Sequence, residues 1–387
     1  NSQVDKSDLI SFINKIKSES SFRYNSKLYN ETEFSARKVK EVLPTYAPDA
    51  EEVDGRIVLR DNFDKMFSDI PEAMIFGEDV GKIGGVNQGV EGLQAKYGEL
   101  RVSDTGIRET TILGQGIGLS LRGLKPIAEM QYLDYLLYAF QTMADDIATL
   151  HYRTHGGQIS PVIIRTRGHR LEGIWHSGSP MGMIIHGTRG VNICVPRDMT
   201  KAAGFYNTLM VSNEPAMVVE CLNSYRVKEK LPNNMGEFRT PLGIPETTKE
   251  GKDVTIVTYG STWRIVTEAA NQLEEFGISA EVIDIQTLVP LDINHTMIES
   301  LKKTNRLLVV DEDVPGGASA YILQNIIEDQ KGFYHLDSEP QTLAAKAHRC
   351  AYGKDGDYFS KPSIEDVFEK VYNMMHEVDP QRFPELY

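Results

Sequence analysis

From about Arg56 onward, short runs of apolar and β-branched residues alternate with segments of helical periodicity. The apolar runs span 73–79, 161–166, 191–196, 216–221, 253–260, 280–285 and 306–312. Continuous apolar runs of this length are typical of strands in parallel sheets, which helices cover on both faces. The pattern therefore predicts an α/β fold with mostly parallel sheets flanked by helices.

Two helical segments can be placed from their periodicity. Apolar side chains recur at helical spacing between residues 133 and 150 and predict a helix with one buried face. That face contains Leu136, Phe140, Met143, Ile147 and Leu150. Near the C-terminus, Ser363 precedes Asp366 by three residues at the start of an amphipathic segment, 364–378. This is the spacing of a capping box, and it predicts a final helix there.

A polar stretch divides the pattern into two parts. Because this stretch is rich in Asn, Lys, Pro, Gly and Thr and has no periodic segment, we interpret 226–250 as a linker. A chain of 387 residues is longer than one core usually supports, so we expect two domains, at 56–225 and 251–387. Residues 1–55 are polar, with one helical segment near 7–16, and we interpret them as a connector or tail. Since the first residue is Asn rather than Met, we expect that the chain is cut from a longer one.

The charge balance disfavours several classes of protein. The 41 Lys and Arg residues against 55 Asp and Glu give a net charge of -14, which argues against nonspecific binding to nucleic acid or anionic membranes. No run approaches the roughly 18 apolar residues that span a bilayer, and no secretion signal is recognisable at the N-terminus. We therefore expect a cytoplasmic protein with no nucleic-acid or membrane partner. Cys194, Cys221 and Cys350 lack metal-ligand spacing, so we expect reduced core cysteines and no metal site.

The motifs alone give only weak candidates for a site. The sequence Gly-Gln-Gly-Ile-Gly at 114–118 does not have the spacing of a dinucleotide-binding loop, so close helix packing is the better interpretation. Glu109 stands near the predicted start of an apolar helix, where a carboxylate is favoured by the helix dipole. His176 lies in a turn-rich loop after the run at 161–166, and loops beyond strand ends often carry chemistry in α/β proteins. Tyr135 alone would be assigned to the core.

A resemblance to a known family supplies the chemistry. Ordered blocks include FGEDVGKIGGV at 76–86, the stretch 103–135, WHSGSPMG at 175–182, VNICVPRDMTKAAG at 191–204 and EVIDIQTLVPLD at 281–292. With these blocks the chain resembles the beta subunit of the thiamine-diphosphate-dependent decarboxylase component of 2-oxo-acid dehydrogenase complexes, of the branched-chain and pyruvate type, in the transketolase superfamily. The resemblance implies a pyrimidine-binding transketolase-like domain followed by a transketolase C-terminal domain. It also implies oxidative decarboxylation of a 2-oxo acid with acyl transfer to lipoamide.

The same resemblance implies roles for particular residues. Glu109 matches the glutamate that hydrogen-bonds a ring nitrogen of the cofactor's aminopyrimidine and favours the imino tautomer. Tyr135 matches the aromatic residue that packs on the pyrimidine, and Gln131 and Ile107 match neighbours of that ring. His176 matches the histidine that faces the reacting carbon and serves acyl transfer to lipoamide, a role that suits a group of near-neutral pKa.

The resemblance also implies partners. The Gly-Asp-Gly and Asn-Asn motif that binds diphosphate and magnesium is not found, and the family places it on an alpha half. We therefore expect an alpha subunit or fused alpha domain, a homodimer of this part and a lipoyl transacylase as partners. Pyruvate and branched-chain substrates both remain open. Two other functions also remain open, namely transfer to a sugar as in transketolase or deoxyxylulose-phosphate synthase, and a non-catalytic assembly subunit.

Overall fold

The computed structural model describes residues 6–169, 178–349 and 354–387. Its first sheet has seven strands in the order β12-β6-β7-β5-β4-β2-β3. The strands are β2 Ala73–Gly77, β3 Val102–Asp104, β4 Lys125–Met130, β5 Ile163–Gly168, β6 Asn192–Cys194, β7 Ala216–Cys221 and β12 Thr287–Val289. All neighbours are parallel except β12, which pairs antiparallel with β6 and comes from the far side of the predicted linker.

Both faces of this sheet are buried, because successive side chains of a strand point to opposite faces and apolar side chains of both sets pack into hydrophobic clusters. In β5, Ile163 packs with the core on one face and Ile164 with the core on the other. The first face is covered by α2 Gly55–Asp69 and α7 Met199–Val211, and the second by α4 Glu109–Ser120 and α6 Met181–Gly187.

The second sheet has five strands in the order β14-β13-β10-β11-β9. They are β9 Glu246–Lys249, β10 Val254–Thr258, β11 Ala280–Asp284, β13 Leu307–Val310 and β14 Gln341–Leu343, and only β9 is antiparallel to its neighbour. One face carries α8 Thr262–Glu275 and α12 Ile364–Val378, and the other carries α9 Met297–Thr304 and α10 Ala318–Gln324. The mostly parallel, helix-flanked architecture predicted from the sequence is confirmed.

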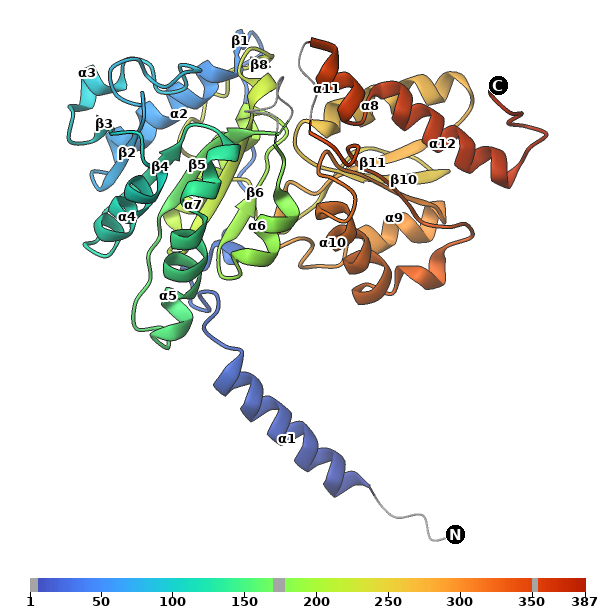
Figure 1. Cartoon of the computed structure of the whole chain (residues 1–387), viewed down its shortest axis with the longest axis horizontal. Coiled ribbons are helices and arrows are strands. Elements are labelled where there is room, and N and C mark those ends of the chain that lie inside the picture. Colours follow the sequence, from blue (N-terminus) through green and yellow to red (C-terminus); the bar gives the residue numbers. More distant parts are fainter. Residues whose placement is uncertain (1–5, 170–177, 350–353) are drawn as a thin grey trace.

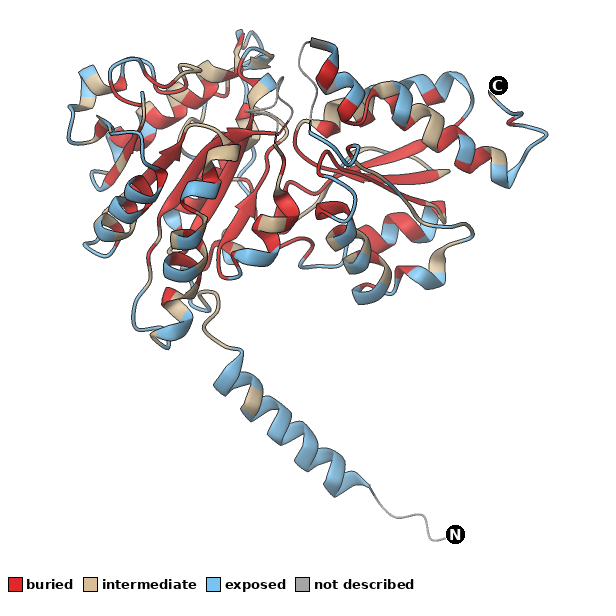
Figure 2. Cartoon of the chain, viewed as in Figure 1, coloured by how far each residue is buried: buried red, intermediate tan, exposed pale blue. Residues whose placement is uncertain are grey.

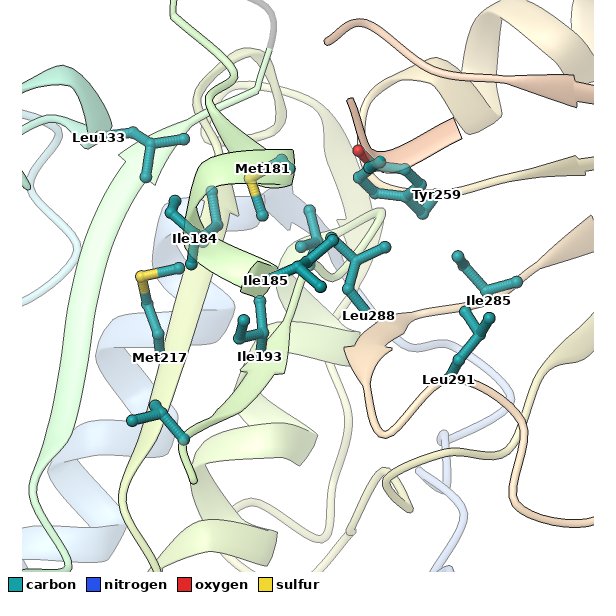
Figure 3. Close-up of a cluster of buried hydrophobic side chains, with 14 of the residues drawn as sticks. Leu133, Met181, Ile184, Ile185, Ile193, Met217, Tyr259, Ile285, Leu288 and Leu291 are labelled. Atoms are coloured by element: carbon teal, nitrogen blue, oxygen red, sulfur yellow. The ribbon is translucent and has the colours of Figure 1, made fainter. Parts of the chain in front are cut away.

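One hydrophobic core runs from the first sheet into the second. Met181 and Ile185 of α6 lie in the same cluster as Tyr259, Ile285 and Leu288 from the second half of the chain (Figure 3). The two sheets therefore share buried side chains across their junction.

The sequence predicted both ends of α12 correctly but not the backbone conformation of residues 133–150. Ser363 and Asp366 form the predicted capping box, and α12 begins at Ile364 and ends at Val378 as expected. The predicted helix at 133–150 is instead divided into a 3-10 helix at Leu133–Tyr138, a π-helix at Thr142–Ile147 and α5 at Ala148–Arg153. Its predicted inner face is still buried, except that Phe140 is half-buried against Gly187 of α6.

The N-terminal residues are only partly separate from the body of the protein. The helix α1 runs from Ser7 to Tyr24, is longer than predicted, and extends away from both sheets without a buried residue (Figures 1 and 2). The residues that follow are attached, because the Glu214 carboxylate accepts hydrogen bonds from the main chains of Asn30 and Ala36.

The remaining elements are short. They are a 3-10 helix at Ala36–Lys38, β1 Glu52–Asp54, α3 Leu93–Tyr97, a 3-10 helix at Leu222–Ser224, β8 Lys228–Lys230, a π-helix at Asn325–Asp329, a 3-10 helix at Gly332–His335 and α11 Lys354–Ser360. Strand β8 pairs antiparallel with β1, and both β8 and the first strand of the second sheet, β9, lie in the stretch for which the sequence predicted no element. Within the described ranges, no helix combines the length and the apolarity needed to cross a bilayer.

Candidate active site

Glu109 is the first residue of α4, and its side chain is only 7% exposed. The preceding Arg108 is extended, so the chain turns into the helix directly at this glutamate. A carboxylate in the first turn is stabilised by the helix dipole. The N-cap position is Arg108, whose side chain makes no capping hydrogen bond, so Glu109 stands inside the first turn of α4 and not at the cap.

Two further acids stand at the carboxyl end of β2, close to Glu109. They are Glu78 and Asp79, and the backbone of Asp79 has a positive φ of 60° that turns the chain over the sheet edge. Burial, together with the charges of Asp79 and Glu109, raises the pKa of Glu78 above its ordinary value. Ligands of open α/β sheets bind beyond the carboxyl ends of the strands, and groups with shifted pKa values are concentrated at functional sites.

The residues after β4 complete this group. The Gln131 side chain donates from Nε2 to Oδ2 of Asp79 at 3.0 Å. Tyr135 lies in the 3-10 helix that follows, and burial first, then the charges of Tyr132 and Glu78, raise its pKa. The rings of Tyr132 and Tyr135 meet edge to face, with 5.8 Å between their centroids. Glu109 is therefore brought together with Gln131 and Tyr135, which come later in the chain, at the ends of β2 and β4.

Of the other two predicted site residues, the structure describes Ile107 but not His176. Ile107 lies two residues before Glu109 and its side chain is 70% exposed, which is unusual for an isoleucine. His176 lies outside the described residues. The main chain of Gly178, just after it, donates to Oδ2 of Asp134 at 3.2 Å, next to Tyr135.

A buried ionic network beneath the site was missed in the sequence. Arg165 and Arg167 occupy alternate positions of β5 and are fully buried. Arg165 donates to Glu220 of β7 and to Glu129 of β4, and Arg167 donates to Glu129 as well. Burial alone would lower the pKa of Arg165, but the two carboxylates hold it well above its ordinary value. Charged residues at alternate positions of an otherwise apolar strand were the available signal.

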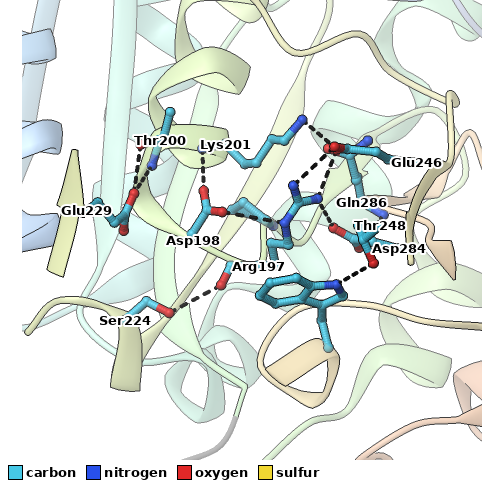
Figure 4. A network of polar contacts seen from close by, with 12 residues as sticks. Arg197, Asp198, Thr200, Lys201, Ser224, Glu229, Glu246, Thr248, Asp284 and Gln286 are labelled. Atoms are coloured by element: carbon cyan, nitrogen blue, oxygen red, sulfur yellow. Dashed lines mark hydrogen bonds and ion pairs between the residues drawn. The ribbon is translucent and has the colours of Figure 1, made fainter. Parts of the chain in front are cut away.

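A second ionic network joins the two sheets. Arg197, just after β6, donates to Glu246 of β9 at 2.9 Å and to Asp284 of β11 at 2.7 Å, and its guanidinium lies over the ring of Trp263 (Figure 4). Although burial opposes the shift, Arg197 and, to a smaller extent, Lys201 lower the pKa of Glu246 to about 2. Asp284 is fully buried, so the desolvation of its carboxylate outweighs the same arginine and raises its pKa to about 6.

The chemistry of the donor set fits an aminopyrimidine better than a metal. In the part of the chain that the structure describes, no group of three or more His, Cys, Asp or Glu side chains is arranged to hold a metal ion. The buried Glu109 carboxylate could bind a ring nitrogen, and Tyr135 offers an aromatic face next to it. Cys194 and Cys221 are free and buried, as predicted, and Cys350 lies outside the described residues.

Known proteins identify the family. The sequence matches the pyrimidine-binding domain of transketolase over residues 51–228 and the C-terminal domain of transketolase over residues 245–354. The split-gene transketolase described as an inactive beta4 tetramer has the same fold, with a TM-score of 0.66 at 20% identity over 83% of this chain and 98% of that one.

Curated relatives are more specific. The pyruvate dehydrogenase E1 component subunit beta of Bacillus subtilis is 36% identical over 78% of this chain and 92% of its own length. That of Acholeplasma laidlawii is 33% identical over 69% and 81%, and the 2-oxoisovalerate dehydrogenase subunit beta of Bacillus subtilis is 32% identical over 70% and 82%. The chain therefore belongs to the family of E1 beta subunits of pyruvate and branched-chain 2-oxo-acid dehydrogenases, within the transketolase superfamily.

Proposed function

We propose that this chain is the beta half of a thiamine-diphosphate enzyme that decarboxylates pyruvate or a branched-chain 2-oxo acid and transfers the acyl group to lipoamide. The observation that carries the proposal is the buried Glu109 carboxylate at the start of α4, gathered with Gln131 and Tyr135 at the ends of two parallel strands.

Each of these residues has a distinct task in the proposed mechanism. Bound thiamine diphosphate supplies the electron sink for decarboxylation, and the protein supplies orientation and proton traffic. Glu109 holds a proton at a ring nitrogen of the pyrimidine, and its burial keeps water from competing for that position. Tyr135 packs on the ring, while Gln131, fixed by Asp79, sets its position. His176 delivers a proton at the reacting carbon during transfer to lipoamide.

The exposure of the site supports the need for an alpha half. Glu109 is buried, but Ile107, Leu137 and Tyr138 around it are 70%, 57% and 64% exposed. Apolar side chains exposed together are typical of a surface that a partner covers. We infer that an alpha subunit or domain brings the diphosphate and magnesium ligands there, so this chain alone binds thiamine diphosphate weakly or not at all. Calorimetry is the test, and tight magnesium-dependent binding by the isolated chain would contradict the split site.

The outer face of α4 supports pairing with a second copy. Gly114 and Gly118 are exposed on this apolar helix, with no neighbouring atom within 4 Å of the positions that their Cβ atoms would take. Glycines four residues apart let another helix approach closely. We infer a symmetric homodimer of this part. Light scattering at micromolar concentration tests it, and a monomer would count against it. Docking of a lipoyl transacylase and a cytoplasmic location remain predictions.

The experiment that tests the proposed function separates Glu109 from His176. In the complex with its alpha half, Glu109→Gln should slow both the lipoamide reaction and the reaction with an artificial electron acceptor by ~10²–10⁴-fold, since a proton-transfer group is lost. His176→Ala should harm chiefly the lipoamide reaction. Glu99→Gln, at an exposed position, is the matched control. If Glu109→Gln spares the artificial-acceptor reaction, the proposed role of Glu109 is wrong; activity on phosphorylated sugars alone would favour a transketolase.

A further inference from the structure

Arg167 lies in the core beneath the candidate site and contacts the main chain of Gln131. It is the second last residue of β5, its side chain is fully buried, and its Nη1 donates to the main-chain oxygen of Gln131 at 3.2 Å and to Oε1 of Glu129 at 2.8 Å. Its Nε donates to the hydroxyl of Tyr225 at 2.9 Å. The guanidinium is therefore fixed on two sides and holds the backbone of Gln131 in place.

The same guanidinium also lies against the loop that carries Asp79. Its Nη2 is buried without a hydrogen-bond acceptor among the described residues, and a Cβ at Gly85 would come within 3.0 Å of it. Gly85 has a positive φ of 80°, and its N–H donates to the main-chain oxygen of Asp79 at 2.7 Å. Because residue 85 is glycine, the loop can close directly over Arg167.

These contacts all fix the position of Gln131, either directly or through the loop of Asp79. The side chain of Gln131 is held by Asp79, its main chain is held by Arg167, and the loop of Asp79 rests on Arg167 through Gly85. A guanidinium has five N–H donors in a fixed plane, whereas a lysine has one ammonium that cannot reach all these groups at once. The geometry therefore requires an arginine rather than a positive charge alone.

We propose that Arg167 is a positioning residue for the pyrimidine pocket, which acts through Gln131 and the Asp79 loop without touching the cofactor. This inference rests on the proposed function. It explains why a cation whose Nε and Nη1 are both engaged is buried beneath one side of the site, next to two carboxylates that Arg165 alone would balance only in part.

The test uses the complex of this chain with its alpha half and measures thiamine diphosphate binding directly by calorimetry. Arg167→Lys keeps the charge but loses the bond to Gln131, and we expect binding about tenfold weaker, the scale of one lost charge-assisted hydrogen bond. Gln131→Ala should weaken binding by a similar factor. If Arg167 acts through Gln131, the double variant should bind about tenfold, not about a hundredfold, more weakly than the unaltered complex.

Arg165→Lys is the matched control, because Arg165 lies in the same strand and network and is equally buried but does not contact Gln131. It should lower the thermal midpoint while binding stays near that of the unaltered complex. Equal weakening by Arg165→Lys, a multiplicative double variant, or unchanged binding in Arg167→Lys would each overturn the inference. If Gln131→Ala and Glu109→Gln also leave binding unchanged, the proposed function fails with it. If Arg167→Lys does not fold, Gly85→Ala, which presses a methyl group onto Nη2, tests the same contact.

Discussion

Replacing Arg197 with methionine should weaken the junction between the two sheets. The substitution keeps the apolar stem but removes the cation that binds Glu246 and the fully buried Asp284. Among the described residues, Asp284 would keep only the N–H of Gln286 as a hydrogen-bond donor. Leaving a buried charge without its partner costs about 3–5 kcal/mol, and we expect the lower value, about 3 kcal/mol, because Glu246 is partly exposed. For 387 residues that unfold together, at about 2.1 cal/mol/K of unfolding entropy per residue, that corresponds to a fall of about 4 °C in the thermal midpoint.

The pH dependence gives a sharper check. Burial raises the folded-state pKa of Asp284 from 3.8 to about 6, so its ionisation costs stability as the pH rises between these values. Without Arg197 that pKa rises further, so the cost continues to grow above about pH 6. Arg197 first, and then Lys201, lower the pKa of Glu246 from 4.5 to about 2, so the variant lacks Arg197's share of the stability that this shift adds above pH 4.5. Both effects make the substitution more harmful at neutral than at acid pH.

Thermal unfolding followed by circular dichroism at about pH 5 and about pH 8 measures both expectations. Lys65→Met is the matched control, because Lys65 forms an exposed ion pair with Asp69 and should change stability by less than about 0.5 kcal/mol. A loss below about 1 kcal/mol for Arg197→Met, or a loss that does not grow with pH, would refute the reasoning.

Three further predictions concern local features. Ser363→Ala removes the hydroxyl that accepts a hydrogen bond from the N–H of Asp366, and it should lower the free energy of unfolding measured in urea by about 1 kcal/mol. No change would mean that the capping box is not needed for α12. Gly190→Ala should lower the free energy of unfolding by at least about 2 kcal/mol, because the φ of Gly190 is 115° and a Cβ there would lie 2.1 Å from the main-chain oxygen of Ala148. Gly98→Ala, also at positive φ but in open space, should lower it less. Cys194 and Cys221 should resist alkylation until the protein unfolds, because burial hides both thiols and raises their pKa values; rapid labelling of the native protein, read by mass spectrometry, would contradict this.

Local patterns predicted the elements whose causes are local. The apolar run at 216–221 is β7 residue for residue, and the capping box fixes the start of α12. The segment 133–150 shows the limit, because periodicity identifies which side chains are buried but not how the backbone reaches them. There the same inner face is formed by 3-10, π and α turns in succession.

The residues of the candidate site could not be predicted from local sequence patterns alone. Glu109, Gln131 and Tyr135 came from the resemblance, and the structure gathers them, while their roles stay predictions. The alternate charges of β5 marked Arg167 as unusual, but the partners of Asp79 and Arg167 could not be predicted, because they lie 52 and 36 positions away along the chain. Pairs of charges within apolar strands are informative only once the strand order is known.

Strand β12 has a consequence for any attempt to divide the protein. It belongs by sequence to the second half but pairs with β6, with Thr287 opposite Cys194, and so covers an edge of the first sheet. Separating the halves at the linker would leave β6 paired only with β7, with its outer edge exposed, and would open the shared core at Leu288. An uncovered edge strand next to apolar surface is a template for aggregation. We therefore expect each half to aggregate when it is produced alone, although the two halves match two separate domain families.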